Sequence, residues 1–471
     1  MNPVSSSTHP SDPRRRLPAV SVLLDQPQFK SMAASFSYCA LREAVQEALS
    51  EFRSNLQPSD VPPTVEELRT KVVAILHERE LTRVRPVVNA TGIILHTGLG
   101  RAVLPQRAVN ALSGLNRCCN LQIDLDTGLR GQRDSMCQQL LRKLTGAEAV
   151  MLVNNNAAAT FLILAALARD REIVISRGQL IEIGGSFRLP DVIRQSGARM
   201  VEVGTTNKTH LRDYEQAITD QTALILRVNP SNYRIIGFSQ EVPLADLVSL
   251  KKLKPVLVVD DLGCGALVDL TSYGLPKEPT VPESIAAGAD LVCCSGDKLI
   301  GGPQAGIILG KEQYILKLRK HPLSRMLRVG KLTAVALEHT LRLFLEPDSL
   351  AESLPTLRML SLPAETLKQN ALRLKQTLDT ENIPLQIDVV EGQSATGGGS
   401  LPAVPIPTYV LAVSSPDLSP DTISRRLRRN EPPIIARISR QEVQLDMRTL
   451  LPGDDAIIVE ALIGIAHGGT R

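Results

Sequence analysis

Three short apolar segments, each ended by polar or glycine residues, constrain the fold of this 471-residue chain most strongly. They are residues 149–153, 256–259 and 291–294, and their composition is typical of buried parallel strands. The first continues through three asparagines into the mostly apolar residues 157–168, which predicts a strand, a turn and a buried helix. Strands and helices are expected to alternate in this way from about Arg85 to Pro347, as in a doubly wound parallel sheet.

The chain on either side of this large domain, residues 85–347, has different patterns. Residues 1–16 are rich in Ser, Pro and Arg without an apolar stretch, so we expect a disordered tail and not a signal peptide. Residues 17–84 show apolar residues at helical spacing and a capping-box signature, Thr64 with Glu67, which predict a helical N-terminal domain. Residues 348–471 mix helix and strand patterns around a Gly/Pro-rich loop at 397–402, which indicates a smaller α+β domain.

The composition agrees with a large globular protein. With 43% hydrophobic residues and a net charge of +4, a chain of this length is expected to form two or three domains with substantial cores, and its charge indicates no particular partner. The seven cysteines show neither metal-ligand spacing nor a disulfide framework, which favours a reducing, cytoplasmic location. The longest apolar stretch, residues 157–168, is well short of the roughly 20 residues that cross a bilayer, so no membrane segment is expected.

Lys298 follows the third apolar segment directly, in Cys294-Ser295-Gly296-Asp297-Lys298, and a glycine turn comes after it. A lysine that attacks an aldehyde needs a partly desolvated site that lowers its pKa and a rigid turn that aims it. This position therefore suggests the Schiff-base lysine of a pyridoxal-phosphate enzyme, with Ser295 and backbone N–H groups where the cofactor phosphate would lie. A lone Ser-Gly-x-Lys is more often an exposed loop lysine, so other parts of the site are needed.

Two such parts precede Lys298 in the chain. The second apolar segment ends in Asp260 and Asp261, and a carboxylate there can pair with a protonated pyridine nitrogen. Adjacent residues of a strand point to opposite faces, so only one of the two can do this. Asn155 and Asn156 begin the predicted helix, whose free N–H groups form an anion site suited to a phosphate, although each signal alone also fits an ordinary helix cap. The three signals in one order favour a pyridoxal-phosphate site.

Longer motifs carry a family resemblance. They occupy residues 85–89, 95–102, 153–159, 182–188, 231–233, 261–263 and 295–298, with a further match at 17–20. In sequence and order these motifs resemble bacterial L-seryl-tRNA(Sec) selenium transferases over nearly the whole chain. The resemblance implies a fold-type I pyridoxal-phosphate transferase with a parallel or mixed central sheet. It also implies conversion of seryl-tRNA(Sec) to selenocysteinyl-tRNA(Sec) with selenophosphate, through a pyridoxal-phosphate-bound dehydroalanyl intermediate.

The resemblance also assigns residues. Lys298 matches the Schiff-base lysine, and Asp261 in Asp261-Leu262-Gly263 matches the acid of the family, which favours it over Asp260. Ser295, Asn155 and Asn156 are the expected further contacts of the cofactor.

Arginines are the expected ligands of selenophosphate, because guanidinium groups suit a small, highly charged anion. Arg101, Arg325 and Arg328 match arginines of the family, and Arg133, with Arg130, is a weaker candidate. Arg325 and Arg328 are three residues apart, so we expect them to share a helix face.

The RNA partner is implied mainly by the resemblance. With no Trp and 3% aromatic residues the chain offers few stacking platforms, so recognition of shape and phosphates is expected. The helical domain is the expected contact, through Arg42, Arg53, Arg69 and Lys71, which are equally typical of an ordinary helix surface. The resemblance further implies a homodecamer with active sites shared between subunits.

Three positions depart from the family pattern: Gly98, Gln132 and Cys264 stand where asparagine, histidine and serine are expected. Two other functions remain open at this stage. A pyridoxal-phosphate lyase or aldolase acting on a free amino acid would not need the helical domain or the arginines, and a tRNA-binding protein without catalysis would not need Lys298.

Overall fold

The structure is a computed structural model that describes residues 13–33, 35–57, 59–80, 84–185 and 187–467. The chain forms two compact units, Met1–Pro86 and Val87–Arg471. Residues 1–12 of the expected disordered tail lie outside the described residues. The last part of that tail differs from the expectation: Pro13–Arg16 form a 3₁₀ helix (η1), and the Arg14 guanidinium donates to the Leu56 carbonyl at 2.8 Å.

The N-terminal unit is helical, as expected. Its helices are α1 (Val20–Leu24), α2 (Pro27–Met32), α3 (Tyr38–Asn55) and α4 (Val65–Glu80). The capping box before α4 is present: the Thr64 N–H donates to Glu67 Oε2 at 2.6 Å, and the Glu67 N–H donates to Thr64 Oγ1 at 3.2 Å. Leu41, Val45 and Ala48 of α3 are buried in a core with residues of the other three helices, whereas Tyr38, three residues before Leu41, is 63% exposed.

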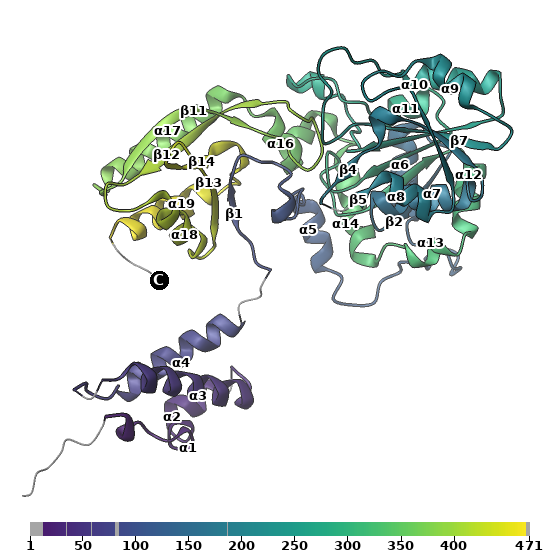
Figure 1. Cartoon of the computed structure of the whole chain (residues 1–471). Coiled ribbons are helices and arrows are strands. Elements are labelled where there is room, and N and C mark those ends of the chain that lie inside the picture. The colour runs from purple at the N-terminus through teal and green to yellow at the C-terminus, as the bar shows by residue number, and fades with distance from the viewer. Residues whose placement is uncertain (1–12, 34, 58, 81–83, 186, 468–471) are drawn as a thin grey trace, which may run out of the picture. The chain divides into compact units, whose positions relative to one another are not determined.

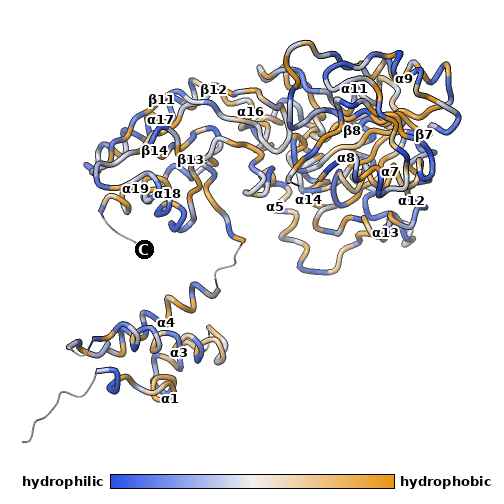
Figure 2. Tube along the Cα trace, viewed as in Figure 1, coloured by the Kyte–Doolittle hydropathy of each residue, from blue (hydrophilic) through white to orange (hydrophobic). Residues whose placement is uncertain are grey.

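A seven-stranded sheet organises the described residues of the large domain. Its order is β2-β10-β9-β8-β7-β3-β6, and only β10 runs antiparallel to its neighbours, so the sheet is mixed. The strands are β2 (Ala149–Val153), β3 (Glu172–Ser176), β6 (Arg199–Val203), β7 (Thr222–Val228), β8 (Leu257–Gly263), β9 (Leu291–Ser295) and β10 (Gly306–Gly310). The three apolar segments singled out in the sequence lie in β2, β8 and β9, and Figure 2 shows this sheet as mostly hydrophobic.

Helices cover both faces of this sheet (Figure 1). Alternate residues of β2 belong to different cores: Val150 and Leu152 pack with α6 and α14, while Met151 and Val153 pack with α7 and α12. The helices of this part are α5 (Gln106–Ser113), α6 (Ser135–Thr145), α7 (Asn156–Leu167), α8 (Leu189–Gln195), α9 (Leu211–Ala217), α10 (Leu244–Ser249), α11 (Val281–Ala286), α12 (Glu312–Lys320), α13 (Leu323–Met326), α14 (Lys331–Leu343), α15 (Leu350–Ser353) and α16 (Pro355–Ser361), with a small hairpin of β4 (Glu182–Ile183) and β5 (Phe187–Arg188). Among the described helices, none combines the length and apolarity needed to cross a bilayer.

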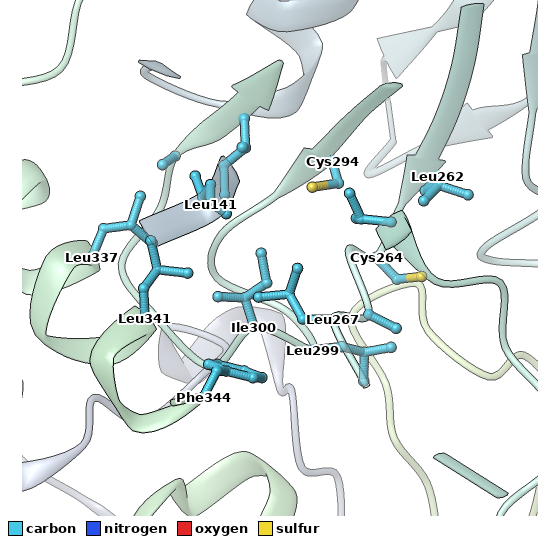
Figure 3. Close-up of a cluster of buried hydrophobic side chains, with 14 of the residues drawn as sticks. Leu141, Leu262, Cys264, Leu267, Cys294, Leu299, Ile300, Leu337, Leu341 and Phe344 are labelled. Carbon is cyan, nitrogen blue, oxygen red and sulfur yellow. The ribbon is translucent and has the colours of Figure 1, made fainter. Parts of the chain in front are cut away.

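The chain just after β9 is fixed by one of these cores. Leu299 is 7% exposed and Ile300 is fully buried, and Figure 3 shows both in the apolar cluster with Leu337, Leu341 and Phe344. Burying two such side chains stabilises the turn by roughly 3–6 kcal/mol. The residue before them, Lys298, is therefore held at the edge of the sheet by apolar packing.

The C-terminal domain contains a second, five-stranded sheet, in the order β1-β13-β14-β12-β11. Its described elements are β1 (Val88–Ala90), β11 (Gln386–Ser394), β12 (Ile406–Ser414), β13 (Ile434–Ser439), β14 (Glu442–Asp446), α17 (Ala364–Thr380), α18 (Pro420–Arg428) and α19 (Asp454–Ala466), and the three helices share an apolar core with the sheet.

Two segments next to the expected domain limits at 85 and 347 pack with the neighbouring domain. β1 pairs in parallel with β13, so residues 88–90 belong to the C-terminal sheet. Leu350, Leu354 and Leu357 pack into the core of the large domain, so that domain extends past residue 347. Pairing between segments more than 300 residues apart leaves no local pattern in the sequence.

Arg448 joins the two parts of this larger unit, and its removal tests that role. The side chain is 1% exposed, and its guanidinium donates to the carbonyls of Met359 (2.7 Å), Leu362 (3.0 Å) and Pro407 (2.6 Å). Because Arg448→Met would leave these acceptors without a donor, we expect it to lower the free energy of unfolding by about 3 kcal/mol or more in urea titrations. The exposed Arg373→Met is the control, and equal stability of the two variants would contradict this role.

Candidate active site

A cavity of about 310 Å³ lies at the carboxyl ends of β8 and β9. Lys298, Asp261, Asn156 and Ser295, which the sequence singled out, all line it, together with Arg101. Parallel strands bring their carboxyl ends to one edge of a sheet, and this is why residues far apart in the chain meet here.

Lys298 is buried, with 7% of its surface exposed. Burial is the main cause that lowers the pKa of its amine, and the Arg101 guanidinium lowers it further, although the Asp261 and Asp297 carboxylates act in the opposite direction. A lowered pKa increases the fraction of neutral amine, which is the nucleophilic form. The residue therefore has the property that its position in the sequence predicted.

Asp261 is held by three hydrogen bonds. Its Oδ1 accepts from the Asn156 amide at 2.8 Å and from the Gly263 N–H at 3.1 Å, and its Oδ2 accepts from Thr160 Oγ1 at 2.7 Å. Burial nevertheless raises the pKa of this carboxyl. A cationic N–H group in the cavity would offset that cost, because an opposite charge favours the carboxylate.

Asp260 faces the other side of β8. It is fully buried, and it accepts from the Arg227 guanidinium and from Ser284 Oγ, both at 2.6 Å. The strand pattern alone did not decide which of the two aspartates faces the cofactor site. Side chains alternate between the two faces of β8, and Asp261 is the one that lines the cavity.

The start of α7 supplies backbone donors to the same cavity. Asn155 is the N-cap residue, and its side chain accepts from the Ala158 N–H at 2.8 Å, so its amide oxygen is used to cap the helix. Asn155, Asn156 and Ala157 also line the cavity, next to Ser295. The first N–H groups of a helix attract anions, so this corner suits a phosphate.

The cavity fits pyridoxal phosphate in three respects. It has a buried amine for the aldehyde, a buried carboxyl for the ring nitrogen and a helix N-terminus for the phosphate. In addition, Asn156 Oδ1 is buried without a hydrogen-bond partner in the described part of the chain. A buried acceptor of this kind is costly, which is consistent with a site built around a further polar group.

The predicted arginines are divided between two places. Arg101 lines the Lys298 cavity, and its guanidinium pairs with Asp297 Oδ2 at 2.6 Å. Arg133, Arg325 and Arg328 line a second cavity of about 260 Å³ that does not contain Lys298. We call it the arginine cavity.

The geometry of the arginine cavity differs from the sequence expectation. α13 ends at Met326, so Arg328 lies beyond it and does not share a helix face with Arg325, although both reach the same cavity. Burial, followed by the charge of Arg328, lowers the pKa of Arg133. Cations that repel one another in a partly enclosed space favour an anionic ligand. Gln132, one of the departures, lines this cavity too.

Some site residues escaped the sequence analysis. Thr160, which donates to Asp261, is the one polar residue of the stretch 157–168, and that isolation was a usable signal. The position of Gly399 had no such signal: a Cβ there would lie 3.5 Å from Lys298 Nζ. Two of the positions that depart from the family pattern also have defined neighbours. The Cys264 thiol donates to Glu278 at 3.0 Å, and Gly98 lies beside His96.

Comparisons with known proteins agree with this geometry. The solved structure of a D-glucosaminate-6-phosphate ammonia-lyase superposes with a TM-score of 0.54 and 21% identity, covering 82% of this chain and 96% of the other. The two proteins therefore belong to the same fold class.

Sequence relatives identify the family to which the chain belongs within this fold class. The L-seryl-tRNA selenium transferase family model matches residues 87–451. The L-seryl-tRNA(Sec) selenium transferase of Moorella thermoacetica is 44% identical over 97% of this chain and 98% of its own length. That of Haemophilus influenzae is 44% identical over 93% and 96%. The chain belongs to the L-seryl-tRNA(Sec) selenium transferase family.

The raised pKa of Asp261 makes a prediction for the cofactor-free protein. A carboxyl whose pKa is raised on folding costs nothing below its unfolded pKa and destabilises the fold as the pH rises through the folded pKa. We therefore expect Asp261→Asn, which keeps the Oδ1 acceptor and can donate to Thr160 Oγ1 in place of Oδ2, to unfold at a higher temperature than the unsubstituted protein at pH 8. The difference should shrink toward pH 4, near the unfolded pKa of about 3.9.

Asp260→Asn is the matched control, since it removes the ion-pair partner of Arg227 and should destabilise the fold. Thermal unfolding of both variants, stripped of cofactor, measures this. A lower melting temperature for Asp261→Asn at pH 8 would contradict the electrostatic account.

Proposed function

We propose that this protein converts L-seryl-tRNA(Sec) to L-selenocysteinyl-tRNA(Sec), with pyridoxal phosphate as cofactor and selenophosphate as selenium donor. The observation that carries the proposal is the 44% identity to the Moorella thermoacetica relative. The matched region covers 97% of this chain, so it spans the N-terminal helical unit as well as the domain with the cavity. A lyase for free amino acids would need the cavity alone.

Each cavity residue has a role in this proposal. Lys298 holds the cofactor through its amine, Asp261 pairs with the ring nitrogen, and the N-terminus of α7 with Ser295 holds the phosphate. Asn156 and Thr160 keep Asp261 oriented through the hydrogen bonds described above. Pyridoxal phosphate supplies an electron sink that allows a bond to the substrate Cα to break.

The reaction balances as an exchange at the seryl Cβ. The Cα–H and Cβ–O bonds break and water leaves; a Cβ–Se bond then forms and Cα regains a proton. Water cleaves the P–Se bond of the donor and releases phosphate. Lys298, whose neutral amine is favoured by burial, is positioned to accept and return the Cα proton.

The arginines would bind the selenium donor. Arg101 lies in the Lys298 cavity, whereas Arg133, Arg325 and Arg328 line the arginine cavity of the same chain. We propose that the active site is completed between subunits of a homo-oligomer, a homodecamer by family resemblance, so that Arg325 and Arg328 of one subunit serve Lys298 of another. Their mutual repulsion is then relieved by the phosphate of the donor.

The tRNA would bind through the N-terminal unit. The proposed reaction implies a cytoplasmic location, where aminoacyl-tRNA is made. Arg42 and Arg53 are exposed on α3. Arg69 is paired with Glu66, and Lys71 is paired with Glu51 at 2.5 Å. Arg42 and Arg53 are therefore the stronger candidates for phosphate contacts.

Substitution of Lys298 tests the chemistry. Lys298→Ala should reduce formation of selenocysteinyl-tRNA(Sec) by at least roughly a hundredfold, because it removes both the cofactor attachment and the proton-transfer group. Lys311→Ala is the control, since Lys311 pairs with Asp290 away from the cavity and Lys251 also pairs with that carboxylate. The assay compares charged tRNA(Sec), with and without selenophosphate, against free serine. Turnover of free serine alone would favour the lyase.

Mixed oligomers test the shared site. Lys298→Ala subunits and Arg325→Ala/Arg328→Ala subunits should each be inactive alone. When they are co-assembled, a site that combines Lys298 from one subunit with the arginines of another is intact, so we expect part of the activity to return. If the mixture stays as inactive as its components while assembling normally, the arginines act within their own subunit.

A further inference from the structure

A glycine-rich loop of the C-terminal domain passes close to Lys298. Gly397, Gly398 and Gly399 all have positive φ, at 71°, 58° and 75°. A Cβ at Gly397 would lie 2.5 Å from Ile93 Cγ2, and one at Gly398 would lie 2.8 Å from Leu95 Cβ. Only glycine fits both the backbone conformation and the space.

Backbone hydrogen bonds hold this loop in place. The Leu95 N–H donates to the Thr396 carbonyl at 2.7 Å, and the Ile94 N–H donates to the Ala395 carbonyl at 3.0 Å. On its other side, a Cβ at Gly399 would lie 3.5 Å from Lys298 Nζ and 3.4 Å from Ser231 Oγ. The loop backbone is therefore a fixed wall beside the amine.

A cavity of about 570 Å³ is lined by this loop and by Ser231, and we call it the loop cavity. Ser231 lines both the loop cavity and the Lys298 cavity, so the two adjoin. The volume is in the range of small-molecule sites.

Among the described residues, no charged side chain lines the loop cavity: serine, asparagine and glutamine residues line it together with apolar ones such as Leu401 and Val404. Ser400 lines it, is 2% exposed, and its Oγ has no hydrogen-bond partner among the described residues. Within the same residues, the N–H groups of Gly398 and Gly399 have no protein acceptor. A buried hydroxyl without a partner is costly, and a polar, neutral ligand would remove that cost.

We propose that the loop cavity binds the 3′-terminal nucleoside of the aminoacyl-tRNA. The inference rests on the proposed function, because the seryl group is esterified to the terminal ribose and must reach Lys298. The nucleoside is neutral, and it offers both an apolar base face and hydrogen-bonding edges to this mixed, uncharged lining. Unpaired RNA ends are recognised in this way through their exposed base edges.

The test uses seryl-tRNA(Sec) with its normal 3′-terminal nucleoside and the same RNA ending in an abasic ribose. We expect the holoenzyme to lose roughly tenfold or more in kcat/KM on the abasic substrate, because base contacts are lost. Ala395→Trp, which places a bulky side chain in the loop cavity, should lower kcat/KM on the normal substrate and abolish the difference between the two.

A second pair of variants tests the unpartnered hydroxyl. Ser400→Ala should lower kcat/KM by roughly three- to tenfold through the loss of one hydrogen bond. Thr396→Val is the matched control: its Oγ1 is also buried without a partner in the described chain, but it does not line the loop cavity, so activity should stay within twofold. Asp388 is exposed on β11, so Asp388→Trp is the control for adding an indole side chain in Ala395→Trp.

The outcomes separate the two proposals. If the unsubstituted holoenzyme converts normal and abasic substrates equally, and Ala395→Trp and Ser400→Ala match their controls, the loop cavity is not the nucleoside site although the proposed function stands. If no charged tRNA(Sec) is converted at all, the proposed function fails first. Melting temperature and the visible absorbance of bound pyridoxal phosphate show whether each variant folds and loads.

Discussion

The position of Lys298 depends on how the chain turns after β9. The Gly296 N–H donates to the Ala305 carbonyl and the Gly302 N–H to the Gly296 carbonyl, both at 2.9 Å, so the turn closes on itself. A Cβ at Gly296 would lie 2.8 Å from the Pro303 carbonyl oxygen, which excludes any side chain there. With Ile300 fully buried behind it, the backbone at Lys298 is held in place. Apolar packing and backbone hydrogen bonds thus place an amine where charge is disfavoured.

In both the Lys298 cavity and the arginine cavity, burial disfavours the charged form of an ionisable side chain. Burial lowers the pKa of Lys298 and raises that of Asp261, so both groups are pushed toward their neutral forms in the absence of a ligand. A cofactor with an aldehyde and a basic ring nitrogen uses both tendencies. In the arginine cavity, burial and the charge of Arg328 lower the pKa of Arg133, a cost that an anionic ligand would relieve. Each cavity therefore carries a penalty that its proposed ligand removes.

Much of the fold was predictable because its signals are local. Thr64 and Glu67 are three residues apart, and their reciprocal hydrogen bonds form at the start of α4 as the spacing predicted. The apolar runs in β2, β8 and β9 predicted buried strands, and the mixed sheet with a helical N-terminal domain is confirmed. The prediction that Arg325 and Arg328 share a helix face was wrong, because α13 ends between them. The roles of the site residues in catalysis and binding remain predictions.

The sequence by itself determined three of the buried strands, the helix that follows the first of them and the capped start of α4, and it singled out Lys298 and the adjacent pair Asp260 and Asp261. Those features are encoded by side-chain periodicity and by glycine and asparagine at turns, which act over a few residues. Only the tertiary structure decided that β1 joins the C-terminal sheet, that the arginines divide between two cavities, and that Gly399 lies against Lys298. Contacts across 100 residues or more depend on how whole elements pack, and packing leaves no periodic trace in the chain.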